Sequence, residues 1–525
     1  NKTKKNYLFF FLIIFSVYSA ISIGIAWDEA HLLKQGEITI KYLLSLGRLD
    51  EEIFRREYHS PIYYSLKYLF LQSFPAKYQI EANHLVNLFF SFGVIIGLKK
   101  LTKELFNESV SRIVFLILFF YPIFYGHMGF NSKDTIIALC HIWIFFLCFK
   151  YLKNQHVKEK TSNYVIYISL LTAVGSGINL YFLGSLLPLF VFLIMDFFFF
   201  KKIKSKKFNV KRFYADILKC FFIIYFLLVL FWIDTHPNIA VLPFTLFYEW
   251  LVHDFWKGFP YILFNGNYYL YEEIPKSYLI INILYKSPEY FLFTYIIFLF
   301  VLIFSKNFFQ SKFVNFNYFI SLILLMLVFP FLLLYFTPFS IYDGLRHVLW
   351  MFPYACIIPG LTIYYLLKNL NTMWGKTISF FTSLLVIYFL FNFFTLTPYQ
   401  YTYLNIFNGP VENRYKKFEN DYWGSSIKEL IGKVNFKKKS TIYFSTCGLN
   451  ENDAENYLKR KGFSKFRFVD TSSSRYIIMT NRVTLDKENI YKTENLTNCF
   501  DKFPGQDVFK VERNGIVLSV IRIIN

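Results

Sequence analysis

The chain has 525 residues, of which 55% are hydrophobic, 22% are aromatic and only 17% are charged. A soluble domain cannot bury apolar surface in that proportion, because its core stops growing with chain length. The composition therefore excludes an ordinary soluble protein and indicates a chain embedded in a lipid bilayer. The formal net charge of +21 would also suit a nucleic-acid-binding protein, so the positions of the basic residues decide between the two.

Eleven apolar stretches are long enough, at roughly 20 residues each, to cross about 30 Å of hydrocarbon, although the second is short. They lie near residues 7–25, 83–99, 110–127, 134–151, 163–181, 183–200, 214–233, 288–305, 316–336, 347–367 and 377–395. The pattern predicts an all-α polytopic membrane protein with about eleven transmembrane helices.

The basic residues lie in short clusters between these stretches. If the amino terminus is cytoplasmic, every even-numbered connection faces the cytoplasm, where an excess of lysine and arginine is expected. These connections carry Lys99, Lys100 and Lys103; Lys150, Lys153, Lys158 and Lys160; the segment 201–212; Lys306 and Lys312; and Lys368 and Lys376. The charge therefore reports topology and argues against nucleic-acid binding. It predicts a cytoplasmic amino terminus and an extracytoplasmic carboxyl terminus.

The first apolar stretch follows Lys2, Lys4 and Lys5 in the manner of a signal peptide. No small-residue cleavage site precedes Trp27, so we interpret the stretch as an uncleaved membrane anchor.

The six cysteines show no metal-ligand spacing. Four of them lie in predicted spans and are interpreted as packing residues: Cys140, Cys148, Cys220 and Cys356. Cys447 and Cys499 lie in the tail, where an oxidising compartment would permit them to form a disulfide.

Long segments occur only on the predicted outer side. The outer loops are 26–82, 128–133, 234–287 and 337–346, and the first and third are much longer than the others. In the first loop, apolar residues recur at helical spacing in Ile38–Leu46 and Tyr63–Phe70, which predicts amphipathic helices lying in the membrane interface. Aromatic residues of the third loop are interpreted as an interfacial belt, with stacking on sugar or lipid as the alternative. They are Trp256, Tyr268, Tyr269 and Tyr271.

From Pro398 the composition changes and no stretch is long enough to span a membrane. Short β-rich segments alternate with a helical stretch, which predicts a small extracytoplasmic α/β domain at 398–525 after a transmembrane module at 1–397. The segments are Thr441–Ser445, Arg475–Thr480 and Ile516–Ile524, and the helical stretch is Asn452–Lys461.

Asp28 and Glu29 directly follow the first span and open the first outer loop. Carboxylates at a membrane boundary are commonly solvated helix ends. A fixed carboxylate there could also take a proton from an acceptor held at the membrane surface.

A tight outer hairpin joins the third and fourth spans and carries His127, Asn131, Lys133 and Asp134. Single polar residues at span ends can be interfacial anchors, and a single histidine is more often a packed ring than a catalyst. Four such residues in one short hairpin favour a site.

The hairpin between the ninth and tenth spans reads Tyr342-Asp343-Gly344-Leu345-Arg346-His347. Arginine suits phosphate because its planar fork donates two hydrogen bonds and stays charged at any pH. The alternative is a snorkelling arginine, but Asp343 and His347 lie within one turn of Arg346.

Taken in order, these segments resemble the C-type glycosyltransferase superfamily, in particular the bacterial relatives of dolichyl-phosphate-mannose protein mannosyltransferases. The resemblance covers about the first 425 residues. It rests on Asp28-Glu29, His59-Ser60-Pro61-Ile62-Tyr63-Tyr64, Phe130-Asn131-Ser132-Lys133-Asp134, Tyr342-Asp343-Gly344-Leu345-Arg346-His347, and Pro398-Tyr399-Gln400-Tyr401 followed by Asp421-Tyr422-Trp423-Gly424. Ser60 departs from a His-Pro-Pro signature, and His84 stands where many relatives carry arginine.

The resemblance implies an enzyme of the bacterial inner membrane that takes a sugar from a polyprenyl-phosphate donor and inverts its anomeric carbon. Asp28 would be the base, and Glu29 and Asp134 would orient the acceptor or a basic neighbour. The donor phosphate would contact Lys133, Arg346, His347 and His84. Substrate contacts would come from His59, His127, Asn131, Tyr342 and Asp343. The acceptor, whether protein, glycan or lipid, is left open.

No cofactor is expected, because the sugar arrives already activated and the chain has no glycine-rich phosphate loop. A divalent metal is possible on the outer carboxylates but is not indicated. A transporter or flippase of lipid-linked sugars is the main alternative. It is disfavoured because the candidate polar residues gather at span ends and not near mid-bilayer. A receptor or scaffold acting through the tail would not need eleven spans.

Overall fold

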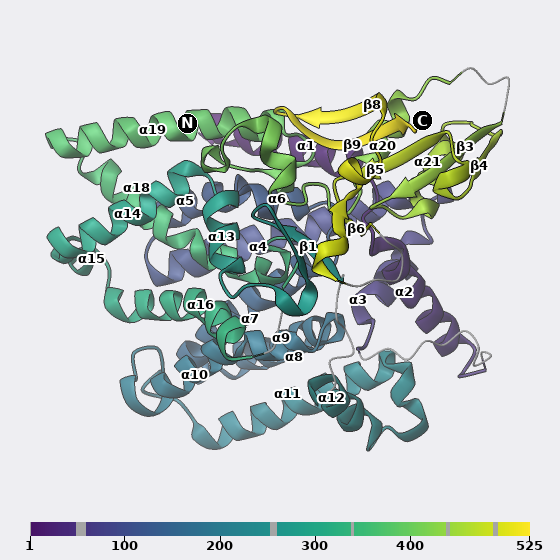
Figure 1. Ribbon diagram of the computed structural model, residues 1–525. Helices are drawn as coiled ribbons and strands as arrows, with labels where there is room; N and C mark the ends of the chain where they lie inside the picture. The colour runs from purple at the N-terminus through teal and green to yellow at the C-terminus, as the bar shows by residue number, and fades with distance from the viewer. Residues whose placement is uncertain are drawn as a thin grey trace.

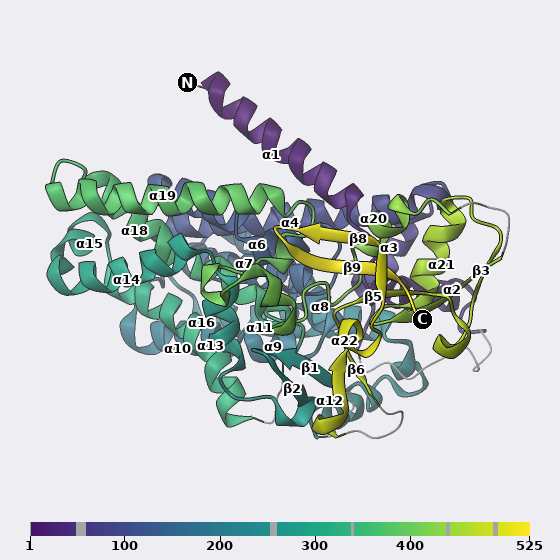
Figure 2. The same cartoon turned by 45° about the horizontal axis from the view of Figure 1, so that its top comes forward.

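The computed structural model describes residues 2–48, 59–252, 260–337, 341–436, 441–486 and 492–524. Most of its long helices run side by side, and a small sheet lies at one end of the bundle (Figures 1 and 2). Parts of three expected outer loops, including Trp256, lie outside these residues.

The transmembrane module is built almost wholly from helices. They are α1 (Lys2–Ser22), α4 (Gln79–Leu105), α5 (Glu108–Phe119), α6 (Pro122–His127), α7 (Asp134–Asn154), α8 (Lys158–Ile178), α9 (Tyr181–Ser185), α10 (Leu187–Met195) with the π-helical turn η3 (Asp196–Phe200), α11 (Val210–Phe231), α14 (Glu289–Phe304), α15 (Lys306–Lys312), α16 (Phe316–Phe336), the 3₁₀ turn η6 (Arg346–Met351), α17 (Phe352–Ala355), α18 (Ile357–Lys368) and α19 (Met373–Thr395). Within the described residues, seven helices are long and apolar enough to cross a membrane, or eight if one bent pair is a single span.

A helix occupies each of the eleven predicted stretches, but four of them do not meet that length and hydropathy criterion. In the first, the described apolar part runs only from Tyr7 to Ser22. The third is broken into α5 and α6, and the fifth, α8, opens with Lys158-Glu159-Lys160. The eighth, α14, is the second half of the bent pair and meets α13 (Tyr278–Lys286) at 110°. The count of eleven therefore stays a prediction.

Two helices form the centre of the bundle. Of the apolar window in the segment Arg346–Lys368, 89% is buried, and 72% of that in α7. The corresponding shares are 11% in α11 and 17% in α19, so these two present most of their apolar surface outward, as lipid-facing helices do. The candidate residues Asp134 and Arg346 thus each begin a central helix.

Several helices start at a side-chain cap that the sequence supplies. Asn107 accepts a hydrogen bond from Val110 N at the start of α5, Asn209 from Arg212 N at α11, and Thr372 from Gly375 N at α19. Each cap satisfies a backbone N–H that the first helical turn leaves without a partner.

In its described residues the predicted first outer loop contains the 3₁₀ turn η2 (Ala76–Tyr78) and two α-helices, α2 (Glu29–Leu44) and α3 (Ile62–Leu71). They cross closely at Gly36, where an added Cβ would lie 2.3 Å from the carbonyl oxygen of Tyr64. Helices occupy both predicted stretches, with α2 beginning nine residues before Ile38, at the acidic pair itself, and their location in the membrane interface stays a prediction.

The third outer segment contains η4 (Ile233–Asn238), α12 (Leu242–Val252), the hairpin β1 (Tyr261–Phe264) and β2 (Asn267–Leu270), the turn η5 (Tyr271–Glu273) and α13. Asn265 and Gly266 both have positive φ, 50° and 86°, as a two-residue Asn-Gly hairpin turn requires. The same turn chemistry, at Asn514-Gly515, joins β8 to β9.

The carboxyl-terminal region forms a five-stranded sheet of order β4-β3-β5-β9-β8, in which β3 is parallel to β4 and β5 and the other pairs are antiparallel. Its elements are η7 (Gln400–Thr402), η8 (Ile406–Asn408), η9 (Val411–Lys416), α20 (Ile427–Lys433), β3 (Ile442–Cys447), α21 (Glu451–Arg460), β4 (Phe466–Phe468), η10 (Thr471–Ser473), β5 (Tyr476–Thr480), β6 (Val483–Leu485), η11 (Thr493–Asn495), β7 (Leu496–Asn498), α22 (Cys499–Lys502), β8 (Gln506–Arg513) and β9 (Ile516–Ile523). The predicted α/β character is confirmed, and β4, β6, β7 and β8 are additional strands.

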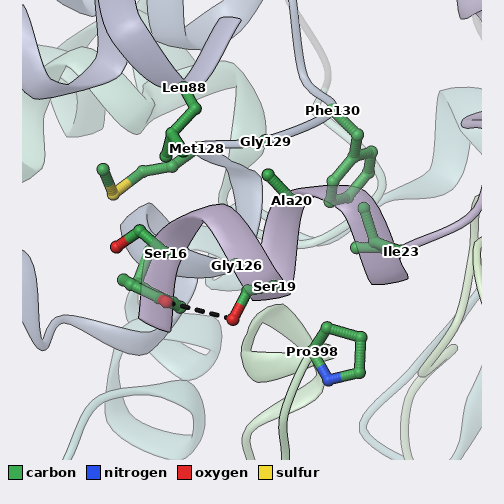
Figure 3. A pocket seen from close by; sticks show the side chains of 11 residues that line it. Ser16, Ser19, Ala20, Ile23, Leu88, Gly126, Met128, Gly129, Phe130 and Pro398 are labelled. Carbon is green, nitrogen blue, oxygen red and sulfur yellow. Dashed lines mark hydrogen bonds between the residues drawn. The ribbon is translucent and has the colours of Figure 1, made fainter. Parts of the chain in front are cut away.

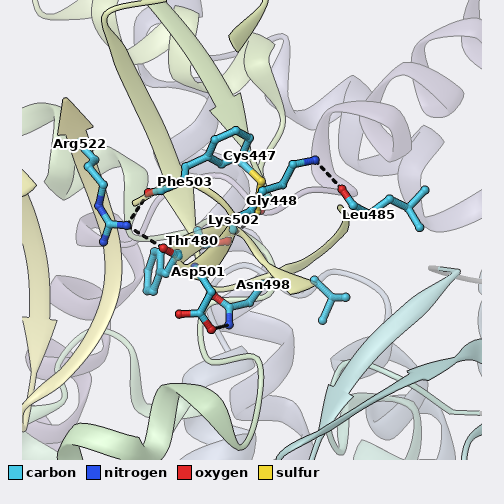
Figure 4. The surroundings of a disulfide bond; sticks show 12 residues. Cys447, Gly448, Thr480, Leu485, Asn498, Asp501, Lys502, Phe503 and Arg522 are labelled. Atoms are coloured by element: carbon cyan, nitrogen blue, oxygen red, sulfur yellow. Dashed lines mark hydrogen bonds between the residues drawn. A yellow bond between two sulfur atoms is a disulfide. The ribbon is translucent and has the colours of Figure 1, made fainter. Parts of the chain in front are cut away.

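Cys447 and Cys499 form the disulfide that the sequence left open. It links the end of β3 to the start of α22 and lies beside Gly448, Thr480 and Asn498 (Figure 4).

The carboxyl-terminal region forms hydrogen bonds with the segment that follows α1. Gly24 N donates to Ser425 O at 2.9 Å, and Ile25 N donates to the Tyr457 hydroxyl at 2.7 Å. One hydrophobic core contains residues from both regions, such as Tyr125 and Tyr401. The domain boundary at residue 397 therefore stays a prediction, because packing continues across it.

Gly24 is a sharp test of this contact. An added Cβ would lie 2.4 Å from Ser425 O, and neither backbone can move without breaking the hydrogen bond between them. We expect Gly24→Ala to destabilise the protein by about 1–3 kcal/mol, measured as a lower thermal unfolding temperature in detergent. Gly432→Ala, where an added Cβ meets nothing within 4 Å, is the control and should leave the unfolding temperature unchanged or slightly raise it, because alanine favours a helix over glycine. Equal unfolding temperatures for the two variants would contradict this account.

Candidate active site

The acidic pair lies where α1 gives way to α2, and its two members differ in surroundings. Asp28 precedes α2 and is half-buried, and its carboxylate forms no hydrogen bond or ion pair with any residue that the structure describes. Its charge acts on Asp134 and Arg346, which places all three groups in one region. Asp28 is therefore a carboxylate near other charges with its oxygens available.

Glu29 is only 2% exposed, and its oxygens are occupied. It accepts hydrogen bonds from Ala26 N at 2.6 Å and from the Asn83 amide, and His84 Nε2 lies 3.2 Å from it. The other ring nitrogen of His84 lies 2.9 Å from Ala20 O, a pure acceptor, so Nδ1 carries a proton. The contact between Nε2 and Glu29 then requires one further proton, held on either partner. His84 is thus bound to Glu29 through one nitrogen and to the backbone through the other.

The hairpin before α7 is organised by Asn131. Its Oδ1 accepts from Lys133 N and Asp134 N at 3.1 and 2.9 Å, which fixes the orientation of the amide. The Nδ2 group therefore faces and donates to Asp134 Oδ2 at 2.9 Å and His127 Nδ1 at 3.3 Å. His127 Nε2 in turn meets the Tyr422 hydroxyl at 2.9 Å. The buried Asp134 is thereby held in one position at the amino end of its helix.

The hairpin before η6 presents a buried arginine. Asp343 and Gly344 have φ of 53° and 70°, a left-handed turn that brings Asp343 back beneath Arg346. Arg346 Nε and Nη2 both lie 3.1 Å from Asp343 Oδ2, and the guanidinium stacks on the rings of Tyr342 and Trp423. Its third nitrogen, Nη1, lies 3.6 Å from Asp134, which is too long for a hydrogen bond. Nη1 is buried and has no hydrogen-bond partner in the described part of the chain.

The carboxyl-terminal region closes this network. Arg482 Nη2 lies 3.3 Å from Asp343 Oδ1, and Arg482 Nη1 donates to Tyr422 O. Polar contacts thus form a closed ring, which we call the charge ring. Its members are Arg482, Asp343, Arg346, Asp134, Asn131, His127 and Tyr422.

Lys133, His59 and His347 lie at the edge of the charge ring. The half-exposed Lys133 has no side-chain partner within the described ranges, and its charge acts on both histidines. Burial, together with the charges of Lys133 and His31, lowers the pKa of His59 to about 3, so His59 is neutral at physiological pH. His347 packs against the Tyr342 ring at 4.7 Å.

Three charged residues of this site carry no signal that sequence analysis used. Lys286 reaches Gly344 from the bend between α13 and α14, Arg482 comes from the turn after β5, and the buried Glu419 accepts from Val483 N at 3.0 Å. Burial raises the pKa of Glu419 to about 7, against the effect of Arg482 and with that of Asp343. Sequence motifs supplied every other member of the charge ring, including Tyr422.

A large apolar cavity of about 740 Å³ lies between α3, α4, α7 and α8. It is lined by residues such as Phe70, Phe89, Leu139 and Leu171. Lys67 also lines it, and the Lys67 ammonium is buried without a hydrogen-bond partner among the described residues, 5.1 Å from the Tyr63 ring. Its charge interacts with that of Glu29. The cavity thus combines an apolar lining with two charged residues: Lys67, near the acidic pair, and Glu81, which is paired with Lys428 and Arg460.

A much smaller hollow of about 10 Å³ lies between α1 and the hairpin 125–130 (Figure 3). Ser19 and Tyr125 meet across it at 3.1 Å. Its volume holds one water molecule at most, so it is not a substrate site.

Metal ligands are not gathered at the site. Within the residues that the structure covers, no group of three or more His, Cys, Asp or Glu side chains could hold a metal ion. The charge ring instead uses arginines to neutralise its carboxylates.

No protein-family model matches the chain, and no curated protein sequence is significantly similar to it. In fold it is similar to two solved membrane proteins. ArnT from Cupriavidus metallidurans, in its apo state, aligns with 99% of this chain and 98% of its own, at 9% identity and a TM-score of 0.49. The oligosaccharyltransferase of Archaeoglobus fulgidus aligns with 91% of this chain and 70% of its own, at 10% identity and a TM-score of 0.48. Both are C-type glycosyltransferases, the superfamily that the motifs resemble.

Other structures of the same two proteins give similar alignments. One contains ArnT bound to undecaprenyl phosphate, at a TM-score of 0.48, and one contains the archaeal enzyme with an inhibitory peptide and dolichol-phosphate, at 0.47. At such identities and scores the function of this chain has to be argued from its own side chains.

The raised pKa of Glu419 predicts a pH dependence of stability. In the folded state Glu419 keeps its proton up to about pH 7, whereas in the unfolded state it loses the proton near pH 4.5. The free energy of unfolding therefore falls as the pH rises from about 4.5 to about 7. Glu419→Gln should remove this decrease in the free energy of unfolding, which we expect to be about 1–3 kcal/mol. Thermal unfolding at pH 5 and at pH 8 measures the decrease. The exposed Glu412→Gln is the control, and a Glu419→Gln protein with the wild-type pH trend would refute the assignment.

Proposed function

We propose that the chain is a membrane glycosyltransferase that moves a sugar from a polyprenyl-phosphate donor to an acceptor on the extracytoplasmic side, with inversion at the anomeric carbon. One observation carries the proposal. Counting partners only among the residues that the structure describes, a free carboxylate, a buried arginine with a spare donor and an unpaired lysine lie in one region, and a neighbouring apolar cavity holds a buried lysine. A lipid phosphate needs an apolar channel and cations together, and a water-soluble donor needs no such channel.

The cavity suits the lipid. Its volume of about 740 Å³ falls in the range of small-molecule sites, and its lining is almost wholly apolar. Lys67 would meet the phosphate where the cavity approaches the acidic pair, because a buried ammonium without a partner is stabilised by an anion. The isoprenoid chain would lie between α3 and α4, and the sugar would face Asp28.

Asp28 would be the general base. It would take the proton of an acceptor hydroxyl while that oxygen bonds to the anomeric carbon, and the bond from that carbon to the phosphate oxygen breaks with its electron pair going to the phosphate. The departing phosphate gains negative charge. Arg346 Nη1 and Lys133 would stabilise it more in the transition state than in the bound donor.

The remaining predicted residues would act through these groups. Glu29, held by His84, would fix the start of α2 and hence Asp28, so His84 is assigned a positioning role in place of the phosphate contact. Asp134, Asn131, His127 and Asp343 would hold Arg346 through the charge ring. His59, Tyr342 and His347 would border the sugar. The acceptor class stays open, and nothing in the described residues favours a transporter.

If Asp28 is the base, replacing it with a residue of the same shape that cannot accept a proton should greatly lower turnover. Asp28→Asn keeps the volume and the backbone cap of α2 but cannot take a proton, so we expect turnover to fall by about 10²–10⁴-fold with the donor KM little changed. Transfer from a polyprenyl-phosphate sugar by the purified protein measures it. Asp470→Asn, an exposed residue of the carboxyl-terminal sheet region, is the matched control. Near-wild-type turnover of Asp28→Asn would eliminate Asp28 as the base.

The role of Lys67 predicts the opposite kinetic signature. Lys67→Met keeps the apolar stem and removes the charge, so we expect the donor KM to rise about tenfold while the acceptor KM is unchanged. Lys77→Met, an exposed lysine just beyond α3, should have no effect. If Lys67→Met alters only the acceptor KM, the cavity does not bind the donor.

A further inference from the structure

Arg482 belongs to the carboxyl-terminal region, yet its side chain lies inside the candidate active site. It is only 4% exposed and follows β5 directly. Its guanidinium contacts Asp343 and the carbonyl of Tyr422, and it stacks 5.6 Å from the ring centroid of Trp27, the residue before Asp28. It therefore joins the phosphate-binding hairpin and the acidic pair.

The backbone on both sides of Arg482 is fixed. Asn481 donates from its amide to Tyr415 O and Phe418 O, both at 2.9 Å, and accepts from Asn420 N at 2.9 Å. Val483 N donates to Glu419 at 3.0 Å. These bonds pin the turn 481–483 to the segment that contains Tyr422 and Trp423.

The disulfide supports the same turn from the other side. Cys499 N donates to Arg482 O at 3.0 Å, and Cys447 is the other half of the bridge. Gly448 has a φ of 73°, and an added Cβ there would lie 2.8 Å from Arg482 Cβ. The disulfide and Gly448, both shown in Figure 4, thus support the backbone of Arg482.

Asp343 divides its two oxygens between two arginines. Oδ2 is bound by Arg346 Nε and Nη2, and Oδ1 faces Arg482 Nη2. If Arg482 lost its charge, Arg346 would have to balance more of the negative charge of Asp343, with Lys286 as the other cation that acts on it, because a buried carboxylate requires cations. Arg346 would then be held more tightly by the protein and would offer less positive charge to a phosphate.

We propose that Arg482 is a positioning residue of the active site, which keeps Arg346 available for the donor phosphate by sharing Asp343 with it and which holds Trp27 beside Asp28. This inference rests on the proposed function. It makes the carboxyl-terminal sheet region a structural part of the catalytic site and not an appended domain.

Binding of undecaprenyl phosphate to the purified full-length protein tests the proposal, because it needs neither the sugar nor the acceptor to be known. We expect Arg482→Gln to weaken binding about tenfold and Arg482→Lys, which keeps the charge, to weaken it less. Arg467→Gln, an exposed arginine on β4, is the control and should bind as the wild type does.

A double-mutant cycle with Asp343 distinguishes positioning from a loss of folding. Without Asp343 there is no carboxylate for Arg482 to share, so Asp343→Asn/Arg482→Gln should bind undecaprenyl phosphate within about threefold of Asp343→Asn alone. The double variant also removes both buried charges together, which protects the test if Arg482→Gln folds poorly. Losses that simply add would overturn the proposal.

Different outcomes refute the role of Arg482 and the donor site. If the wild type binds undecaprenyl phosphate and Arg482→Gln binds it equally well, the role of Arg482 is refuted while the proposed function stands. If the wild type does not bind undecaprenyl phosphate at all, the donor site is refuted, and the role of Arg482 with it.

Discussion

The structure depends on the burial of Arg346 between two carboxylates. Taking a guanidinium out of water costs several kcal/mol, and the cost is offset only where anions and hydrogen bonds are already in place. Asp343 supplies two contacts to Arg346 at 3.1 Å, and Asp134 faces it at 3.6 Å. One donor, Nη1, is left unsatisfied, which is expensive in the absence of an anion and favourable in its presence. The protein therefore presents a buried positive donor where the two hairpins meet.

Holding Arg346 in this position imposes long-range constraints on the chain. The charge ring needs hairpins from both halves of the membrane module and the turn 481–483 of the sheet region at one place. Hydrogen bonds from Gly24 and Ile25 to Ser425 and Tyr457 hold the end of α1 against the same region. This explains why the hydrophobic core continues across the expected domain boundary: an independently moving domain could not keep Arg482 in contact with Asp343.

The sequence predicted the elements whose signal is local. Apolar length located the spans, and clustered polar residues at span ends located Asp28, Asn131, Asp134 and Arg346, which the structure brings together. Arg482, Lys286 and Glu419 escaped prediction because a single charged residue in a polar segment looks solvated. Their burial follows from contacts with distant parts of the chain, such as that of Arg482 with Tyr422, 60 positions away. The span count is equally non-local, because a helix such as α14 is completed by its bent neighbour.

The surroundings of the three acidic residues assign their roles more strongly than their order in the chain does. Asp134 is bound by Asn131 and faces Arg346, so its Oδ2 is engaged and its charge is paired with a cation. Glu29 is bound by Ala26 N, Asn83 and His84, so it holds the chain in place. Asp28 alone of the three has neither oxygen engaged by a described residue, and its position at the start of α2 fixes its backbone. A base must be held rigidly through its backbone and left free at its oxygens, and among these three only Asp28 meets both conditions.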